Sequence, residues 1–162
     1  IAWLGLATLA ATSTERMVRR LGALRWRRLH QAIYVIALLA LIHYFQQTKA
    51  DVTVPTFAAS LFLWLIGYRV LAWWQDTSEL STLSLLGLTI VVSLLTFAGE
   101  AIGIGVAFHV SPLLVLGTVF DFDVGIRPGW QVFAAGLILV ATDAVMARVK
   151  DRGARVREVA AE

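Results

Sequence analysis

The sequence predicts an all-α fold, a polytopic transmembrane helical bundle of about five membrane segments, the first of them partial. Three observations lead to this prediction. Of the 162 residues, 59% are hydrophobic and 15% are charged, whereas an average soluble domain is about 45–50% apolar and about 25% charged. The apolar residues recur in long stretches along the whole chain, and Lys and Arg gather in alternate connections between these stretches.

Each apolar stretch is judged against a bilayer core about 30 Å thick, which needs roughly 17–25 helical residues. The first stretch is shorter than this. Because the chain opens inside it, we expect an N-terminal part of the protein to precede this sequence. Pro55 and Pro128 stand near the starts of later stretches, where a missing N–H is harmless. The expected segments are 1–11, 29–45, 56–74, 83–110 and 129–147.

The basic residues give the expected orientation. Cytoplasmic loops of membrane proteins carry the excess of Lys and Arg. If the segments cross in turn, Lys49 and Arg127 fall on one side of the membrane and the other basic residues fall on the opposite side. We therefore expect the richer side, which includes the C-terminal tail, to be cytoplasmic. Its twelve residues are Arg16, Arg19, Arg20, Arg25, Arg27, Arg28, Arg69, Arg148, Lys150, Arg152, Arg155 and Arg157.

The composition also excludes several kinds of chemistry. The chain has no cysteine, so disulfides, thiolate nucleophiles, iron–sulfur clusters and cysteine-bound metals are excluded. The formal net charge of +3 does not indicate a nucleic-acid partner, because the placement of the basic residues records membrane topology. The expected partner of most of the surface is the lipid bilayer.

Two histidines, His30 and His43, stand at the two ends of the stretch 29–45. Ionisable residues in membrane segments usually face a partner inside the bundle, and histidine is a common axial ligand of haem iron. Thirteen residues correspond to roughly 20 Å of helix, so the pair could serve two stacked haems near opposite membrane faces. Alternatively, both are interfacial residues without a ligand role. The rings lie roughly 140° apart around an ideal helix, so either the helix is distorted or they address different neighbours.

The residues around this pair resemble the MsrQ (YedZ) family, the haem-binding membrane subunit of the periplasmic methionine-sulfoxide reductase system. That family belongs to the ferric-reductase-like transmembrane group. The resemblance combines a basic loop, the histidine spacing and flanking aromatic residues, and it extends through about Ala72. Its pieces are TST at 12–14, RLG at 20–22, the W-x-x-L-H that ends at His30, IHY at 42–44 and GYR at 67–69.

The resemblance implies an electron-transfer subunit rather than a catalytic subunit. Family members take electrons from the cytoplasmic side, through a flavin reductase or the quinone pool. They pass them through b-type haem to a periplasmic molybdenum-containing methionine-sulfoxide reductase, and FMN is a further implied cofactor. His30 and His43 fall on family histidines, so haem iron is their implied ligand. A further family histidine lies in an earlier helix that has no counterpart in this sequence, and the implied location is the bacterial inner membrane.

Three arginines of the basic loop are candidate partners of the haem propionates. Arg20, Arg27 and Arg28 lie at the depth where the propionates of a cytoplasmic-side haem would emerge, and guanidinium groups pair well with carboxylates. Membrane topology alone would also place arginines here. Both readings remain open from the sequence.

The resemblance divides the chain into a haem-binding core, 1–74, and a two-helix extension with a basic tail, 75–162. We expect His109, in the extension, to be an interfacial residue without a ligand role. Glu100 is expected near the outer headgroups. Asp121 and Asp123 have the spacing of metal ligands, but two carboxylates without a further ligand are a weak signal, and a solvated outer loop is the favoured interpretation.

Two other classes of function compete with electron transfer. The chain could be a structural or assembly subunit of a larger membrane complex with no haem of its own. A transporter is disfavoured, because its binding site near the middle of the membrane would require broken helices and buried polar groups, whereas the central parts of these segments are apolar.

Overall fold

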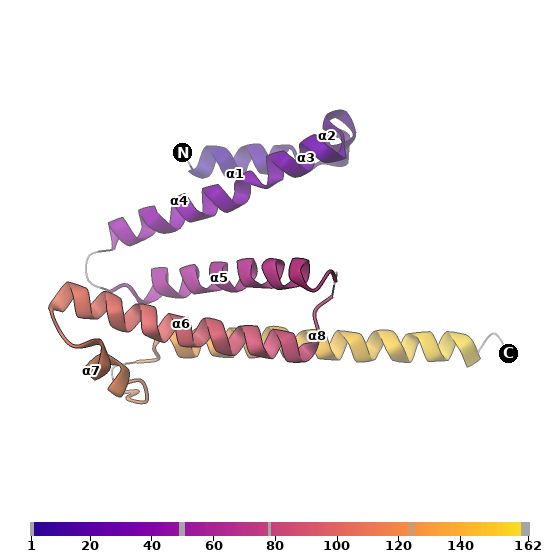
Figure 1. The fold of residues 1–162 in the computed structure, drawn as a ribbon. Helices are drawn as coiled ribbons and strands as arrows, with labels where there is room; N and C mark the ends of the chain where they lie inside the picture. Colours follow the sequence, from indigo (N-terminus) through magenta and orange to yellow (C-terminus); the bar gives the residue numbers. More distant parts are fainter. Residues whose placement is uncertain (1, 49–50, 78, 124, 160–162) are drawn as a thin grey trace. The chain divides into compact units, whose positions relative to one another are not determined.

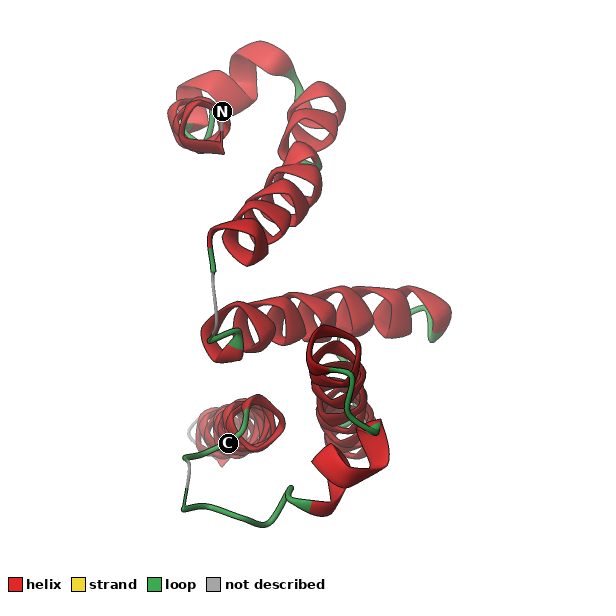
Figure 2. Ribbon diagram, turned by 90° about the vertical axis from the view of Figure 1, so that its left-hand side faces the viewer, coloured by secondary structure: helices red, strands yellow, loops and turns green. Residues whose placement is uncertain are grey.

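A computed structural model describes residues 2–48, 51–77, 79–123 and 125–159. Every regular element in these ranges is a helix, so the predicted all-α class is confirmed (Figures 1 and 2). The helices are α1 (Ala2–Ala11), α2 (Glu15–Leu21), α3 (Ala23–His30), α4 (Ala32–Gln47), α5 (Thr53–Trp74), α6 (Thr82–Phe108), α7 (Pro112–Gly117) and α8 (Pro128–Val159).

Four stretches in the described part are long and apolar enough to cross a membrane. They correspond to the last four predicted segments, whereas the predicted stretch 1–11 forms α1, whose ten residues are too few for a full crossing. The chain is therefore a multi-pass membrane protein. The four candidate spans are Ala23–Gln47, Thr53–Trp74, Thr82–Phe108 and Pro128–Val149.

By its internal packing the chain divides into two compact units, Ile1–Pro55 and Thr56–Glu162. In the first unit α1 packs against α4. Their backbones approach closely at Gly5, where a Cβ atom would lie 2.7 Å from the Cδ1 atom of Ile36. Helices α2 and α3 meet at Gly22, whose φ of 76° favours glycine. The predicted boundary between 74 and 75 rests on the extent of the family resemblance and stays a prediction.

In the second unit α6 packs along α8, and α7 packs against α6. Helix α6 begins at an N-cap, where the Ser81 hydroxyl accepts a hydrogen bond from the backbone N–H of Ser84 at 3.1 Å. Helix α5 is joined to α6 by hydrogen bonds between buried side chains. The Trp64 indole donates to the Thr89 hydroxyl at 3.1 Å. The small apolar core contains Trp64, Leu80, Leu85, Val92, Val132 and Val140.

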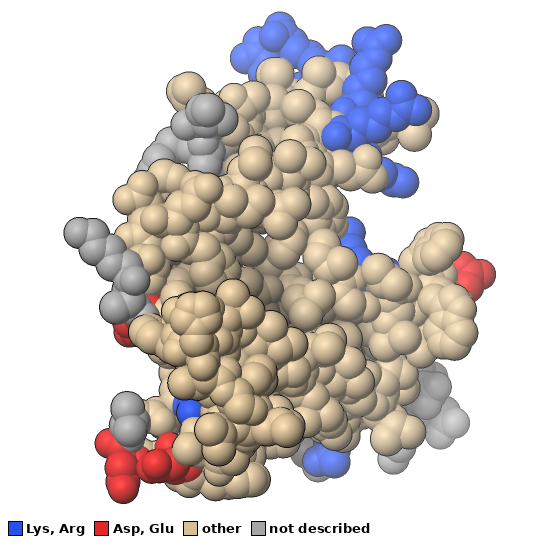
Figure 3. Space-filling view, turned by 60° about the vertical axis from the view of Figure 1, so that its left-hand side comes forward, with Lys and Arg blue, Asp and Glu red and all other residues tan. Residues whose placement is uncertain are grey.

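The surface of the described helices is apolar in the way that lipid contact requires. Leu94 is 61% exposed, Ile138 67% and Trp73 82%. A water-soluble fold rarely exposes contiguous apolar patches larger than a few hundred Å². Most of the surface visible in Figure 3 carries no charged side chain. Exposed apolar surface of this kind marks contact with a membrane or with further protein.

Candidate functional site

His30 is the last residue of α3, and its ring turns back onto its own helix. The Nδ1 atom lies 3.1 Å from the backbone carbonyl oxygen of Trp26. A carbonyl can only accept a hydrogen bond, so Nδ1 is the ring nitrogen that carries a proton. In the neutral ring this leaves Nε2 with its lone pair.

The Nε2 atom of His30 contacts Ser13, in the connection between α1 and α2. The Nε2 atom and the Ser13 Oγ atom are 3.1 Å apart. The same hydroxyl lies 2.7 Å from the carbonyl oxygen of Leu9. Because a serine hydroxyl has a single proton, it donates to Nε2 or to Leu9 at any one time. The Nε2 lone pair therefore faces the Ser13 hydroxyl, which can donate to the Leu9 carbonyl instead.

Trp26 fixes the plane of the His30 ring. The two rings are stacked, with centroids 4.1 Å apart and an interplanar angle of 28°. The Trp26 indole N–H donates to the backbone carbonyl of Thr12 at 3.0 Å. Two pieces of the sequence resemblance, TST and W-x-x-L-H, are thus in direct contact.

His43 lies in a different setting. It belongs to α4, it is exposed, and no hydrogen bond within the described part of the chain involves its ring. Gln31, a turn residue between α3 and α4, keeps helical backbone angles (φ −64°, ψ −20°), and Ala23–Gln47 is one candidate membrane span. The two alternatives left open by the ideal-helix angle therefore both stay predictions.

The three candidate arginines lie at the ends of α2 and α3. Arg20 is in the last turn of α2, whereas Arg27 and Arg28 are in the last turn of α3. All three are exposed. In the described part of this basic segment, the ion pair is between Glu15 and Arg19, at 3.8 Å. The guanidinium groups of Arg20, Arg27 and Arg28 are therefore accessible to an acidic group.

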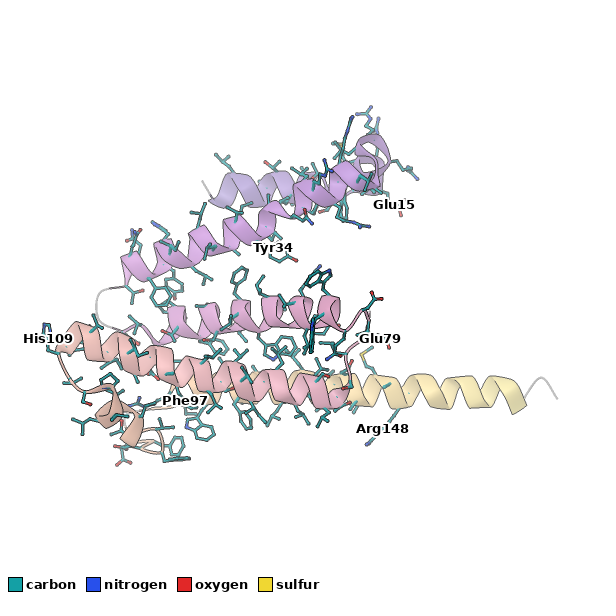
Figure 4. The ribbon with its side chains drawn as sticks, in the orientation of Figure 1. Glu15, Tyr34, Glu79, Phe97, His109 and Arg148 are labelled. Atoms are coloured by element: carbon teal, nitrogen blue, oxygen red, sulfur yellow. The ribbon has the colours of Figure 1, made fainter. Side chains whose placement is uncertain are left out.

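The remaining candidates from the sequence belong to the second unit. His109 is exposed and forms the C-cap of α6 in a left-handed conformation, with φ 54° (Figure 4). The Asp121 carboxylate accepts a hydrogen bond from the backbone N–H of Asp123 at 3.1 Å, and both residues are exposed. Within the described ranges no three His, Cys, Asp or Glu side chains are grouped as metal ligands.

The sequence did not predict an ion pair in the second unit. Glu100 of α6 lies 3.7 Å from Arg127, just before α8, and their side chains are 9% and 20% exposed. The guanidinium group of Arg127 also donates to the Thr118 hydroxyl. Arg127 thus joins α6, the segment after α7 and the start of α8. The available signal was the placement of both charges at the same end of neighbouring segments.

An aromatic cluster lies at the same end of α8, around Trp130. Its indole N–H donates to the carbonyl oxygen of Val119 at 2.9 Å. Phe97, labelled in Figure 4, meets the Trp130 ring edge-on with centroids 5.4 Å apart. The other rings of the cluster are Phe120, Phe122 and Phe133.

No family model matches the chain. No solved structure matches it either. Curated relatives do match, and each is described as a protein-methionine-sulfoxide reductase heme-binding subunit MsrQ. The relative from Bordetella pertussis is 44% identical over 72 residues, which are 43% of this chain and 34% of that protein.

Two relatives from Xanthomonas match over 81 residues, which are 50% of this chain and 35% of each relative. The identity is 45% for the protein from Xanthomonas campestris pv. campestris and 42% for that from Xanthomonas axonopodis pv. citri. The chain spans about a third of the length of the curated relatives it matches. The predicted resemblance is confirmed: over the matched stretch, the chain is a homologue of the haem-binding subunits named MsrQ.

Proposed function

We propose that this chain is part of a membrane electron-transfer subunit that binds b-type haem through His30 and His43. Haem, when bound, supplies one-electron redox chemistry at its iron. The names of the relatives support haem binding and an association with a methionine-sulfoxide reductase. The observation that carries the proposal is the hydrogen bonding of the His30 ring.

The His30 ring fits an axial ligand. Metal-bound histidines almost always donate their second ring N–H to a carboxylate, a backbone carbonyl or water, which fixes the tautomer and raises the basicity of the ligand. His30 makes this contact through Nδ1 with the Trp26 carbonyl. Its Nε2 nitrogen then presents a lone pair, and this nitrogen would be the atom that binds haem iron.

His43 would serve a different haem from His30. The two residues are 13 positions apart, which corresponds to roughly 20 Å of helix. Two axial ligands of one iron lie on either side of it at bonding distance, so this pair cannot ligate the same iron. The exposed ring of His43 faces outward from α4. The second ligand at each level would come from another helix.

Arg20, Arg27 and Arg28 would hold the propionates of the haem at the His30 level. Their positive charge near the iron would favour the ferrous form, which carries one positive charge less than the ferric form. All three are exposed, so they can meet carboxylates that emerge at the membrane surface. Lipid phosphates are the competing partners of the same groups.

The direction of electron transfer rests on the distribution of Lys and Arg. Twelve basic residues fall on the side that carries the C-terminal tail and two on the other, of which Lys49 lies outside the described residues. This asymmetry supports a cytoplasmic C-terminus in the bacterial inner membrane. Electrons would enter from a cytoplasmic flavin reductase, with FMN, or from quinone. They would leave to a periplasmic molybdenum-containing methionine-sulfoxide reductase.

An absorption spectrum tests haem binding most simply. We expect the full-length protein, purified from membranes in mild detergent, to show a Soret band and the sharpened bands of reduced b-type haem after dithionite is added. Denatured protein serves as the control for loosely adsorbed haem. Absence of a Soret band from freshly prepared protein would favour the competing function, a structural or assembly subunit without haem.

A further inference from the structure

We propose that Trp26 and Ser13 are positioning residues for the His30 imidazole. Trp26 would fix the ring plane and the tautomer. Ser13 would hold the Nε2 atom in the haem-free protein and yield it to iron when haem binds. This inference rests on the proposed function, because it concerns the same ring. It adds two residues that act through His30 rather than on the haem itself.

Trp26 restrains the ring in two independent ways. Its indole covers one face of the imidazole, with centroids 4.1 Å apart, which limits rotation about the Cα–Cβ bond. Its backbone carbonyl accepts from Nδ1 at 3.1 Å, which limits rotation about the Cβ–Cγ bond. A flip of the ring would break this hydrogen bond and exchange the two nitrogens. The stack and the bond together hold one orientation.

The indole of Trp26 is itself held in place by a hydrogen bond. Its N–H donates to the Thr12 carbonyl at 3.0 Å, across 14 positions of the chain. Thr12 follows the last residue of α1, so this bond joins the end of α1 to α3. The plane of the His30 ring therefore depends on the packing of α1, because Trp26, which contacts the ring, is hydrogen-bonded to the end of α1.

Ser13 completes the set of contacts without blocking ligation. Iron binding requires a bond from Nε2 to iron, and the bond from the Ser13 hydroxyl to Nε2 must break. The hydroxyl can then rotate to the Leu9 carbonyl, 2.7 Å away. No proton has to leave the ring, because the proton stays on Nδ1, where it is donated to the Trp26 carbonyl. No polar group of the cluster is left without a partner.

His43 offers the contrast within the same chain. Within the residues that the structure describes, the His43 ring makes no aromatic stack and no hydrogen bond. Its ring is therefore not held in advance by this part of the chain. Changes at Trp26 and Ser13 should alter the haem at the His30 level and leave the His43 level unchanged.

The test compares four variants of the full-length protein in detergent: Trp26→Leu, Trp26→Phe, Ser13→Ala and, as a matched control, Trp73→Leu. Trp73 is 82% exposed, so its loss removes a large aromatic group without touching the ring. Haem is titrated into haem-free protein. Electron paramagnetic resonance of the ferric form reports the orientation of the axial imidazoles, and ¹⁵N chemical shifts of the haem-free protein report which ring nitrogen carries the proton.

Trp26→Leu should weaken haem binding at the His30 level about 10–100-fold, the usual effect of losing a residue that orients a metal ligand. It should also change the low-spin ferric signal, because the stack that sets the ring plane is gone, whereas the tautomer should stay as in the wild type because the backbone carbonyl at position 26 remains. Trp26→Phe should recover most of the affinity because it keeps an aromatic face against the ring. Ser13→Ala should bind haem as tightly as the wild type or up to about tenfold more tightly, because the hydrogen bond that iron displaces is gone.

The outcomes separate this inference from the proposed function. If the wild type binds no haem, or if His30→Ala keeps its full haem content and signals, the proposed function is wrong. If His30→Ala loses haem while Trp26→Leu keeps wild-type affinity and signal, the assignment of Trp26 is wrong, and a wild-type proton on Nε2 instead of Nδ1 would contradict the tautomer. Weaker haem binding by Ser13→Ala would contradict the displaceable role of Ser13. An effect of Trp73→Leu as large as that of Trp26→Leu would also overturn the inference.

Discussion

Replacing Gly136 with alanine should separate α6 from α8. A Cβ atom at this position would lie 2.6 Å from the Thr89 hydroxyl oxygen and 3.0 Å from the Thr89 Cβ atom, whereas ordinary contacts begin at 3.4 Å. Thr89 is fully buried and branched at Cβ, so it cannot swing its side chain away. Most of the required movement, about 0.8 Å, must therefore come from the helices.

Two terms set the expected cost. Inserting a methyl group into a well-packed interface typically costs about 1–3 kcal/mol. The same movement disturbs the hydrogen bond from the Trp64 indole to Thr89, and such bonds between membrane helices average about 0.6 kcal/mol. Alanine is favoured over glycine in a helix by up to about 1 kcal/mol, which offsets part of this cost, so Gly136→Ala should lower the free energy of unfolding by about 1–3 kcal/mol.

Gly87→Ala is the matched control, because it adds the same methyl group to a helix of the same unit. Nothing lies within 4 Å of a Cβ atom at Gly87, and alanine is favoured over glycine in a helix by up to about 1 kcal/mol. We expect this variant to be as stable as the wild type or slightly more stable. The assay is equilibrium unfolding in mixed micelles with increasing dodecyl sulfate, followed by circular dichroism. Equal stabilities of Gly136→Ala and Gly87→Ala would refute the close packing of α6 on α8.

Three further predictions concern charge. Arg127→Leu should lower the free energy of unfolding by about 3 kcal/mol because it leaves the Glu100 carboxylate buried and unpaired. Adding Glu100→Leu to this variant should recover most of the lost stability in the same unfolding assay. Hydrogen bonds from Thr53 hold the pKa of Asp51 below its usual value. Their contribution to the free energy of unfolding is therefore complete above the pKa of Asp51 in the unfolded chain. It is lost as pH falls through the lower pKa of the folded chain. Asp51→Asn should remove this part of the acid dependence of unfolding. A reporter fused after Glu162 should be cytoplasmic and one inserted between α4 and α5 periplasmic; the reverse result would overturn the orientation and the direction of electron transfer.

The membrane spans could be predicted from the sequence because length and hydropathy are properties of a continuous stretch. The predicted segment 83–110 and the observed α6 differ by one residue at the start and two at the end. Pro55 was placed just before its helix but lies in the first turn of α5. A proline is tolerated there because that N–H has no partner within the helix. The error is therefore confined to the boundary.

The contacts of the candidate site could be predicted only in part. The sequence identified His30 as a candidate, but the contact with Ser13 spans 17 positions and depends on the reversal of the chain at Gly22. Periodicity within one helix contains no information about such a contact. The joint presence of TST and W-x-x-L-H was the available signal, because both pieces belong to the same resemblance. No motif of the sequence indicates the aromatic cluster around Trp130.

The placement of Glu100 illustrates a second limit. Its position along α6 predicted a place near the outer headgroups, where a carboxylate can remain solvated. In the structure the side chain is 9% exposed and lies 3.7 Å from Arg127. Arg127 was counted in the sequence only as a marker of topology. Charge patterns assign residues to one end of a bundle, but the packing of α6 and α8 decides which of them meet.

A redox titration with haem quantification tests the central claim most directly, on the full-length wild type and the variants His30→Ala, His43→Ala and His109→Asn. Asparagine tolerates the left-handed backbone at position 109, so the last variant removes a histidine without straining the chain. We predict that His30→Ala and His43→Ala each lose haem or shift its reduction potential, because the axial ligand sets that potential, and that His109→Asn matches the wild type. Wild-type haem content and potential in both His30→Ala and His43→Ala would contradict haem ligation by these residues.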